Sequence, residues 1–96
     1  MNKTLQIFYI YADNCPTCEK ILGWVDAITK KQNISVQMLK FRFDDQIALN
    51  IAVNNKIEDL PGVVIGAGDY VFQGKKILRE DIESAIVKLW NKNKKE

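Results

Sequence analysis

The stretch TLQIFYIYADNCPTC, residues 4–18, decides the fold of this 96-residue chain. Its first part is rich in β-branched and aromatic residues and almost continuously apolar after Gln6, which is typical of a strand covered on both faces. Asp13-Asn14 ends the run with turn-forming residues. Pro16 suits the first position of a helix, because a missing N–H costs nothing there. The stretch therefore predicts a strand, a turn and a helix N-terminus, with two cysteines at the junction.

Apolar periodicity and turn residues divide the rest of the chain into further helices and strands. A parallel pair joined by a helix is expected first, because strand-helix-strand units of this size are parallel and right-handed. An antiparallel hairpin follows, around the turn cluster Gly66-Ala67-Gly68-Asp69. The predicted strands cover about 4–11, 34–43, 63–65 and 70–73, and the predicted helices about 16–32, 44–55 and 79–90. The order β-α-β-α-β-β-α predicts an α/β fold, a four-stranded mixed sheet flanked by three helices.

Two of the predicted helices have recognisable caps. Lys30 and Lys31 stand where the last turn of the first helix favours positive charge, and Asn33 suits the left-handed residue that ends it. Asp44 or Asp45 suits the N-cap of the second helix.

The chain has two cysteines and no histidine. The lack of histidine excludes a Ser-His-Asp or Cys-His catalytic arrangement. Two cysteines are too few to complete a four-ligand zinc site of nitrogen and sulfur ligands in one chain. They are also too few for the disulfide scaffold of a small secreted domain, which usually has four, six or eight. We therefore expect a single dithiol, with neither a metal nor another cofactor.

Composition predicts one globular domain over residues 1–96, with 47% hydrophobic and 27% charged residues. The longest apolar run, residues 7–12, is far shorter than the roughly 20 residues of a membrane span. Three lysines and one glutamate in residues 91–96, expected to be a frayed tail, account for the net charge of +2. The remainder has no basic stripe for nucleic acid. The N-terminus lacks the pattern of a signal peptide. We expect a cytoplasmic monomer with reduced thiols and no membrane partner.

The motif Cys15-Pro16-Thr17-Cys18 carries the chemistry. Cys15 falls at the N-cap, where its sulfur can accept hydrogen bonds from the free N–H groups of Thr17 or Cys18. Those bonds and the helix dipole favour a thiolate. Cys18 lies about one turn deeper, within reach of Cys15. We expect Cys15 to attack a substrate disulfide and Cys18 to resolve the mixed disulfide, with Pro16 and Thr17 in contact with the substrate.

Three other interpretations of the two cysteines remain open. The pair from each of two chains could hold a metal ion or an iron–sulfur cluster in a dimer. The protein could be a redox-inactive binding module that works without thiol chemistry. The cysteines could also pack as small buried hydrophobic residues.

The element order and the cysteine motif resemble the thioredoxin fold superfamily, particularly its small thioredoxin-like and glutaredoxin-like members, over about residues 4–90. The segment IEDLPGVVI, residues 57–65, looks like the family's cis-proline segment before a central strand. The resemblance implies that Pro61 is cis and packs against the Cys15–Cys18 pair, and that Leu60 offers its backbone to an extended substrate. It also implies a disulfide reductase acting on protein or small-molecule disulfides, with a reductase or glutathione as electron donor.

Several positions depart from the patterns of these families, and three of them bear on the chemistry. Thioredoxins usually have a tryptophan before the first motif cysteine, where this chain has Asn14. They keep a buried acid six residues before that cysteine, where this chain has Tyr9, so that role is unfilled or taken by water or Glu19. Glutaredoxins grip glutathione with a Gly-Gly pair before the last helix, where this chain has Gly74-Lys75.

Overall fold

The computed structural model of the chain describes residues 4–94. The elements follow the predicted order: β1 (Leu5–Tyr11), α1 (Pro16–Gln32), β2 (Val36–Arg42), α2 (Gln46–Asn55), β3 (Gly62–Ile65), β4 (Tyr70–Gln73) and α3 (Arg79–Lys94). Four strands form one sheet in the order β2-β1-β3-β4. Strand β1 is parallel to β2, whereas β3 is antiparallel to β1 and to β4. The predicted α/β fold with a four-stranded mixed sheet and three helices is thus confirmed.

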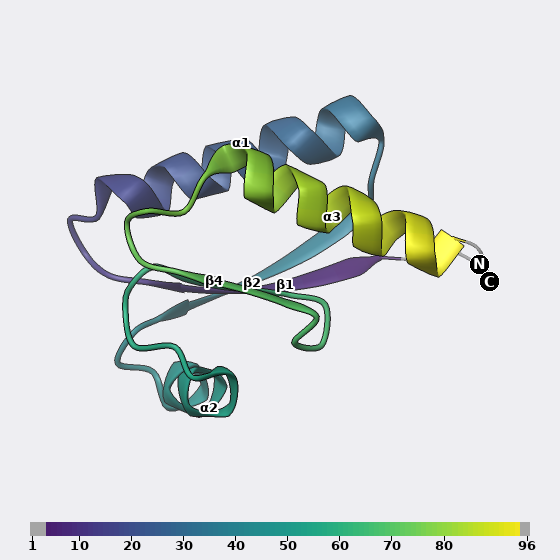
Figure 1. Cartoon of the computed structure of the whole chain (residues 1–96). Coiled ribbons are helices and arrows are strands. Elements are labelled where there is room, and N and C mark those ends of the chain that lie inside the picture. The colour runs from purple at the N-terminus through teal and green to yellow at the C-terminus, as the bar shows by residue number, and fades with distance from the viewer. Residues whose placement is uncertain (1–3, 95–96) are drawn as a thin grey trace.

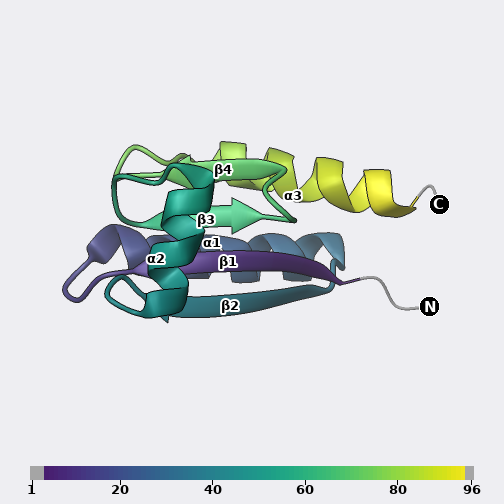
Figure 2. The ribbon, with the colours of Figure 1, turned by 90° about the horizontal axis from the view of Figure 1, so that it is seen from below.

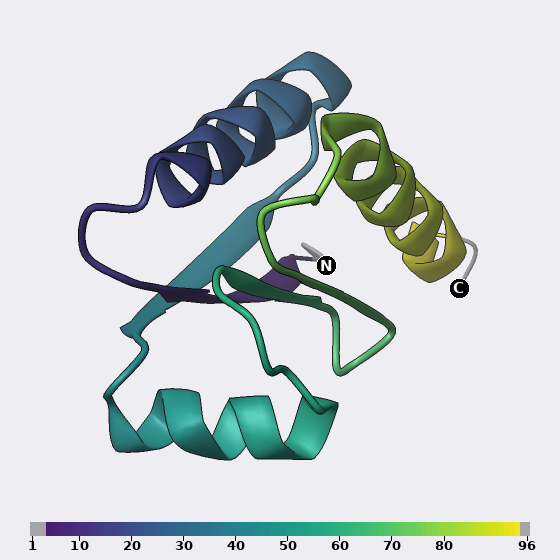
Figure 3. The same ribbon diagram turned by 60° about the vertical axis from the view of Figure 1, so that its left-hand side comes forward.

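The sheet separates two layers of helices. Helices α1 and α3 lie side by side on one face, and α2 lies on the other (Figure 1 and Figure 3). Seen from the side of α2, this short helix crosses the strands rather than following them (Figure 2). The main core lies between the sheet and the pair α1 and α3, and its fully buried side chains include Ile7, Tyr9, Ile21, Val63, Ile82 and Ile86.

Helix α1 begins and ends, and helix α2 begins, at the residues that their predicted caps indicate. Helix α1 starts at Pro16 and ends before Asn33, whose φ of 54° and ψ of 47° are left-handed. Of the two aspartates proposed for the second helix, Asp45 is the N-cap: its carboxylate accepts a hydrogen bond of 2.9 Å from the N–H of Ile47. Local side-chain chemistry therefore sets these boundaries.

Helix α3 is longer than predicted. It continues to Lys94, so residues 91–94 are helical and do not form the frayed tail expected over 91–96; residues 95–96 lie outside the described part of the chain. No glycine or proline interrupts this segment, and lysine is a good helix former that suits a helix C-terminus. Within residues 4–94, none of the helices has the length and apolar character that a membrane span requires.

Helix α2 buries little of its apolar surface. Ala48 is its one buried residue among the described side chains. The outward-facing Ile47 and Leu49 are about half exposed, and Val53 is 78% exposed. Helix α2 therefore leaves three of its large apolar side chains in contact with solvent.

Candidate active site

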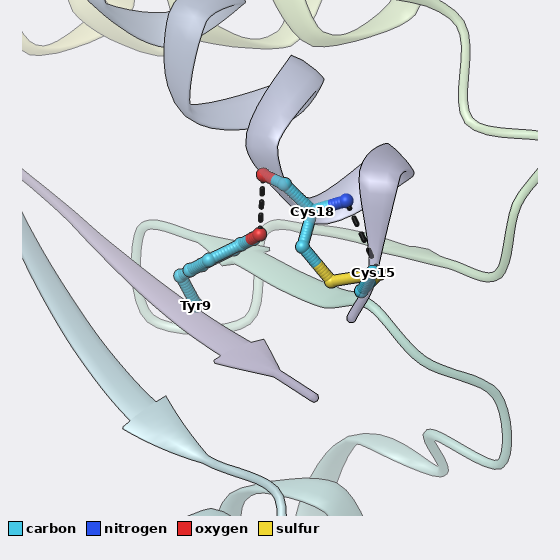
Figure 4. Close-up of a disulfide and its surroundings, with 3 residues drawn as sticks. All are labelled: Tyr9, Cys15 and Cys18. Atoms are coloured by element: carbon cyan, nitrogen blue, oxygen red, sulfur yellow. Dashed lines mark hydrogen bonds between the residues drawn. A yellow bond between two sulfur atoms is a disulfide. The ribbon is translucent and has the colours of Figure 1, made fainter. Parts of the chain in front are cut away.

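The two cysteines form a disulfide bond at the N-terminus of α1 (Figure 4). Cys15 is the N-cap, and its sulfur accepts a hydrogen bond of 3.2 Å from the N–H of Cys18. Of the two donors predicted from the cap position, Thr17 and Cys18, the structure shows the bond from Cys18. Cys15 is half-buried, whereas Cys18 is only 4% exposed. The sulfur that solvent and a substrate can approach more easily is therefore the one at the positive end of the helix.

The turn that presents Cys15 is held to the neighbouring strand. Asn14 has a φ of 54°, a left-handed conformation that asparagine tolerates better than most residues. The guanidinium of Arg42, at the end of β2, lies 2.8 Å from the carboxylate of Asp13. The N–H of Phe43 donates a 2.8 Å hydrogen bond to the carbonyl of Tyr11. Although an exposed ion pair adds little stability, these contacts fix where the turn leaves the sheet.

Tyr9 supports the site from below. Its side chain rises from β1 toward α1, and its hydroxyl donates a hydrogen bond of 2.5 Å to the carbonyl of Cys18 (Figure 4). The side chain is only 1% exposed. Burial, and to a lesser degree the negative charge of Glu19, raise the pKa of Tyr9 well above its ordinary value. The phenol therefore remains a protonated donor that anchors the first turn of α1 to the sheet.

This bond is the part of the site that sequence reasoning missed. Tyr9 occupies the position six residues before Cys15, where thioredoxins keep a buried acid, but the sequence predicted no role for its hydroxyl. Alternation along β1 was the available signal, because it places residue 9 on the same face as the buried residues Leu5 and Ile7, under the helix.

A cleft of about 370 Å³ opens beside the disulfide. The rings of Tyr9 and Tyr11 are stacked there, with centroids 6.1 Å apart. Tyr11 thus lines the space next to Cys15. Within residues 4–94, no three His, Cys, Asp or Glu side chains gather in a way that could hold a metal ion. The charged or phenolic side chains that line the cleft are Tyr9, Tyr11, Asp13, Glu19 and Lys40.

The remaining predicted site residues occupy two places. Pro16 is exposed at the start of α1, and Thr17 is half-buried beside it. The peptide bond between Leu60 and Pro61 is cis, as predicted. Pro61 is fully buried, and its carbonyl accepts a 3.0 Å hydrogen bond from the N–H of Gly74. Neither the N–H nor the C=O of Leu60 is hydrogen-bonded to another residue of 4–94.

The topology brings these two places to one edge of the sheet. Strand β3 is antiparallel to β1, and Gly62 pairs with Ile10. The start of β3 therefore lies beside the end of β1, so the cysteine turn and Leu60-Pro61 leave the sheet at the same edge. Leu60 lines a separate cleft of about 420 Å³, together with Asp59, Gly74 and two lysines. The packing of Pro61 against the disulfide, which the resemblance implies, stays a prediction.

The fold and the helix-terminal disulfide define a thioredoxin-like protein with a Cys-x-x-Cys pair. The chain belongs to the thioredoxin domain family, whose model matches residues 5–87. A comparison with curated proteins finds no match.

Solved structures share the fold at low sequence identity. A thioredoxin-like protein from Clostridium perfringens is 20% identical, with a TM-score of 0.69 over 90% of this chain and 71% of its own. Thioredoxin O2 from Arabidopsis thaliana, in the oxidized state, is 18% identical, with a TM-score of 0.69 over 90% and 75%. Mitochondrial thioredoxin 3 from Saccharomyces cerevisiae, also oxidized, is 18% identical, with a TM-score of 0.66 over 88% and 77%. At these identities the likeness concerns the fold.

Proposed function

We propose that the protein is a thiol–disulfide oxidoreductase that reduces disulfides in proteins or small molecules. The observation that carries the proposal is the position of the Cys15–Cys18 disulfide, with the more accessible sulfur at a helix N-cap. In the reduced protein, the N–H groups of the first turn and the helix dipole stabilise a thiolate on that sulfur. A thiolate is the attacking form in disulfide exchange, so Cys15 is the nucleophile.

The exchange needs only the two cysteines and a substrate. The Cys15 thiolate attacks one sulfur of the substrate disulfide, forms a mixed disulfide with it and releases the other sulfur as a thiolate. Cys18 then attacks the sulfur of Cys15. The bond to the substrate breaks, the substrate leaves as its second thiolate, and the Cys15–Cys18 disulfide forms. Two electrons have passed from the dithiol to the substrate, and no cofactor takes part.

Leu60 is the proposed docking point for an extended substrate. Its backbone N–H and C=O have no partner within residues 4–94, and they lie at the same edge of the sheet as the cysteine turn. Strand-like pairing with a backbone tolerates many side chains, which suits a reductase that acts on diverse proteins. Pro16 and Thr17, at the start of α1, would contact the substrate on the other side of the reacting sulfur.

The cycle also indicates where the protein works. An external donor, either a reductase or glutathione, must reduce the disulfide after each turnover, which favours a reducing compartment such as the cytoplasm. One chain supplies both sulfurs, so we propose that the protein acts as a monomer.

Single cysteine variants test the assignment. Cys15→Ser should abolish reduction of insulin and of small disulfides, because the attacking sulfur is gone. Cys18→Ser should still attack but be unable to resolve, and a covalent mixed disulfide should accumulate on non-reducing gels and in intact-mass spectra. A Cys15→Ser protein that still reduces disulfides would refute the proposal. Stoichiometric metal in the purified protein would favour the dimeric metal site instead, and cysteines inert to oxidants would favour the binding module.

A further inference from the structure

Gln73, the last residue of β4, holds the segment that leads from α2 to the cis-proline. Its side-chain oxygen accepts hydrogen bonds from the N–H of Glu58, at 2.7 Å, and from the N–H of Asp59, at 3.1 Å. Its side-chain nitrogen donates a 3.2 Å hydrogen bond to the carbonyl of Lys56, the C-cap of α2. A glutamine suits this place, because its amide has both an acceptor oxygen with two lone pairs and donor hydrogens. One side chain thus binds three backbone groups.

These bonds leave Leu60 with the first free N–H of the segment. The N–H groups of Lys56 and Ile57 donate back into the last turn of α2, at 3.4 and 2.8 Å. Those of residues 58 and 59 donate to Gln73. The N–H of Leu60 has no partner in the described part of the chain, and the residue after it is a proline, which has no N–H. The segment therefore presents one backbone donor to an incoming strand.

Leu60 is also fixed from both sides. On its N-terminal side, Asp59 is bonded to Gln73. On its C-terminal side, Pro61 is buried, and its carbonyl accepts a 3.0 Å hydrogen bond from the N–H of Gly74. Two consecutive residues at the end of β4 thus hold the two neighbours of the proposed docking point.

We propose that Gln73 is a positioning residue for extended disulfide substrates. It holds residues 56–60 in the conformation in which the backbone of Leu60 can pair with a substrate strand. The inference rests on the proposed function, in which Leu60 is the docking point. The apparent affinity of a site falls in proportion to the fraction of molecules in which that site is formed. A segment without the clamp would form the site in fewer molecules and would have to be ordered on binding, at a cost in affinity.

A small disulfide does not depend on this clamp. It needs the sulfur of Cys15 and not the backbone of Leu60. Gln73 lines the cleft that contains Leu60, whereas it is absent from the lining of the cleft beside the disulfide. Loss of the Gln73 amide should therefore slow the reaction with an extended substrate selectively.

A purely stabilising role for Gln73 would have a different consequence. Its three hydrogen bonds are exposed to solvent, and their loss would lower the free energy of unfolding. That loss would not change the relative rates at which the folded protein reacts with two substrates. The ratio of the two rates therefore separates positioning from stability.

The test uses two mixed disulfides that share one chromogenic aromatic thiol. The other half is a short, uncharged peptide with blocked ends and a central cysteine in one substrate, and 2-mercaptoethanol in the other. The Cys15 thiolate of the reduced protein attacks the non-aromatic sulfur, the substrate S–S bond breaks, and the aromatic thiolate leaves with the electron pair, because the thiol of lower pKa leaves faster. Stopped-flow absorbance gives a second-order rate constant for each substrate.

We expect Gln73→Met to lower the rate constant for the peptide substrate by about tenfold, which corresponds to a docking conformation formed in about a tenth as many molecules. The rate constant for the mercaptoethanol substrate should change by less than about twofold, because its reaction does not use the segment. Gln73→Glu keeps side-chain oxygens that can accept from Glu58 and Asp59. It should therefore retain more of the peptide rate than Gln73→Met does.

Gln46→Met is the matched control. It removes another exposed glutamine amide, whose nitrogen donates a 3.3 Å hydrogen bond to Asn50 within α2. It should leave both rate constants unchanged. A peptide rate constant that is unchanged in Gln73→Met, an equal fall with both substrates, or a Gln73→Glu protein no faster than Gln73→Met would overturn the positioning role. A wild-type protein that releases the aromatic thiol from neither substrate would instead overturn the proposed reductase activity, so the two failures are distinguishable.

Discussion

Tyr9 joins the sheet to the helix that carries both cysteines. Its ring is buried in the core under α1, and its hydroxyl holds the carbonyl of Cys18. A donor at this position stabilises the first turn without adding a charge beside the two sulfurs. The same side chain therefore contributes to packing, to the stability of α1 and to the electrostatics of the redox site.

Replacing Tyr9 with phenylalanine isolates the hydroxyl from the ring. At neutral pH we expect Tyr9→Phe to lower the free energy of unfolding by about 1 kcal/mol, the usual net contribution of such a hydrogen bond. Urea denaturation followed by circular dichroism measures the change. Tyr70→Phe is the control, because the Tyr70 hydroxyl has no hydrogen bond among the side chains described for residues 4–92. Equal losses in the two variants would show that the bond to Cys18 contributes nothing particular.

The same comparison at high pH tests the raised pKa of Tyr9. Burial raises this pKa in the folded chain above the value of about 10 in an unfolded chain. The stabilisation that depends on the protonated phenol is therefore complete below about pH 10 and declines as the pH rises further, by up to about 1.4 kcal/mol per pH unit. The advantage of the wild-type protein over Tyr9→Phe should shrink and then reverse between about pH 10 and 11. A difference that stays constant over this range would contradict the assignment.

Individual site residues differed in how far the sequence could predict them. The N-cap role of Cys15 follows from local rules, because a cysteine before a proline at a helix start has few other geometries. The bond from Tyr9 to Cys18 and the shared cleft of Glu19 and Cys18 depend on how β1 packs under α1. Alternation along β1 indicates only that residue 9 faces the helix, and the atoms that meet across the two elements are seen in the structure.

Among the elements, the helix boundaries that a capping residue sets were predicted correctly. The C-terminal end of α3, which lies in a charged segment, was not. Helix α1 ends at a left-handed Asn33, as its sequence indicates. Helix α3 continues past its last apolar contact at Trp90 to Lys94, where periodicity gives no signal. A hydrophobic pattern indicates which residues are buried, and a helix can extend into solvent without such a pattern.

The two layers of helices should respond differently to truncation of an apolar side chain. Ile21 of α1 is 0% exposed in the main core, so Ile21→Ala should lower the free energy of unfolding by about 2–5 kcal/mol. Val53 of α2 is 78% exposed, so Val53→Ala should change it by less than about 0.5 kcal/mol. Urea titrations of both variants measure these changes. A large loss in Val53→Ala would mean that the outer face of α2 is packed against something in solution.

At the scale of the whole molecule, the fold brings together segments about 45 residues apart in the chain. The cysteine turn follows β1 and Leu60-Pro61 precedes β3, and antiparallel pairing of these strands puts both at one edge. The chain order predicted the parallel pair β1 and β2 and the hairpin of β3 and β4, and both pairings are present. The antiparallel pairing of β3 with β1, which completes the order β2-β1-β3-β4, joins strands far apart in the chain and was not predicted.

This arrangement also bears on the electron donor. The cleft next to Leu60 contains Lys75 and Lys76, which would attract the carboxylates of glutathione, but Asp59 lines the same cleft and would repel them. The β-carbon of Asp59 lies 3.5 Å from where a side chain at Gly74 would begin, so these two residues of the cleft lining are close neighbours. A protein reductase, in contrast, can pair an extended segment with the free backbone groups of Leu60.

We therefore predict that a protein thioredoxin reductase recycles the disulfide faster than glutathione does. NADPH consumption, with insulin as the substrate, compares a thioredoxin reductase with glutathione plus glutathione reductase at equal concentrations of the protein. We expect at least a tenfold difference, which corresponds to about 1.4 kcal/mol in the barrier. Asp59→Asn should raise the glutathione-driven rate several-fold, because it removes the repulsive charge, and should leave the reductase-driven rate nearly unchanged. Turnover with glutathione that equals or exceeds turnover with the reductase would show that the lysines outweigh Asp59.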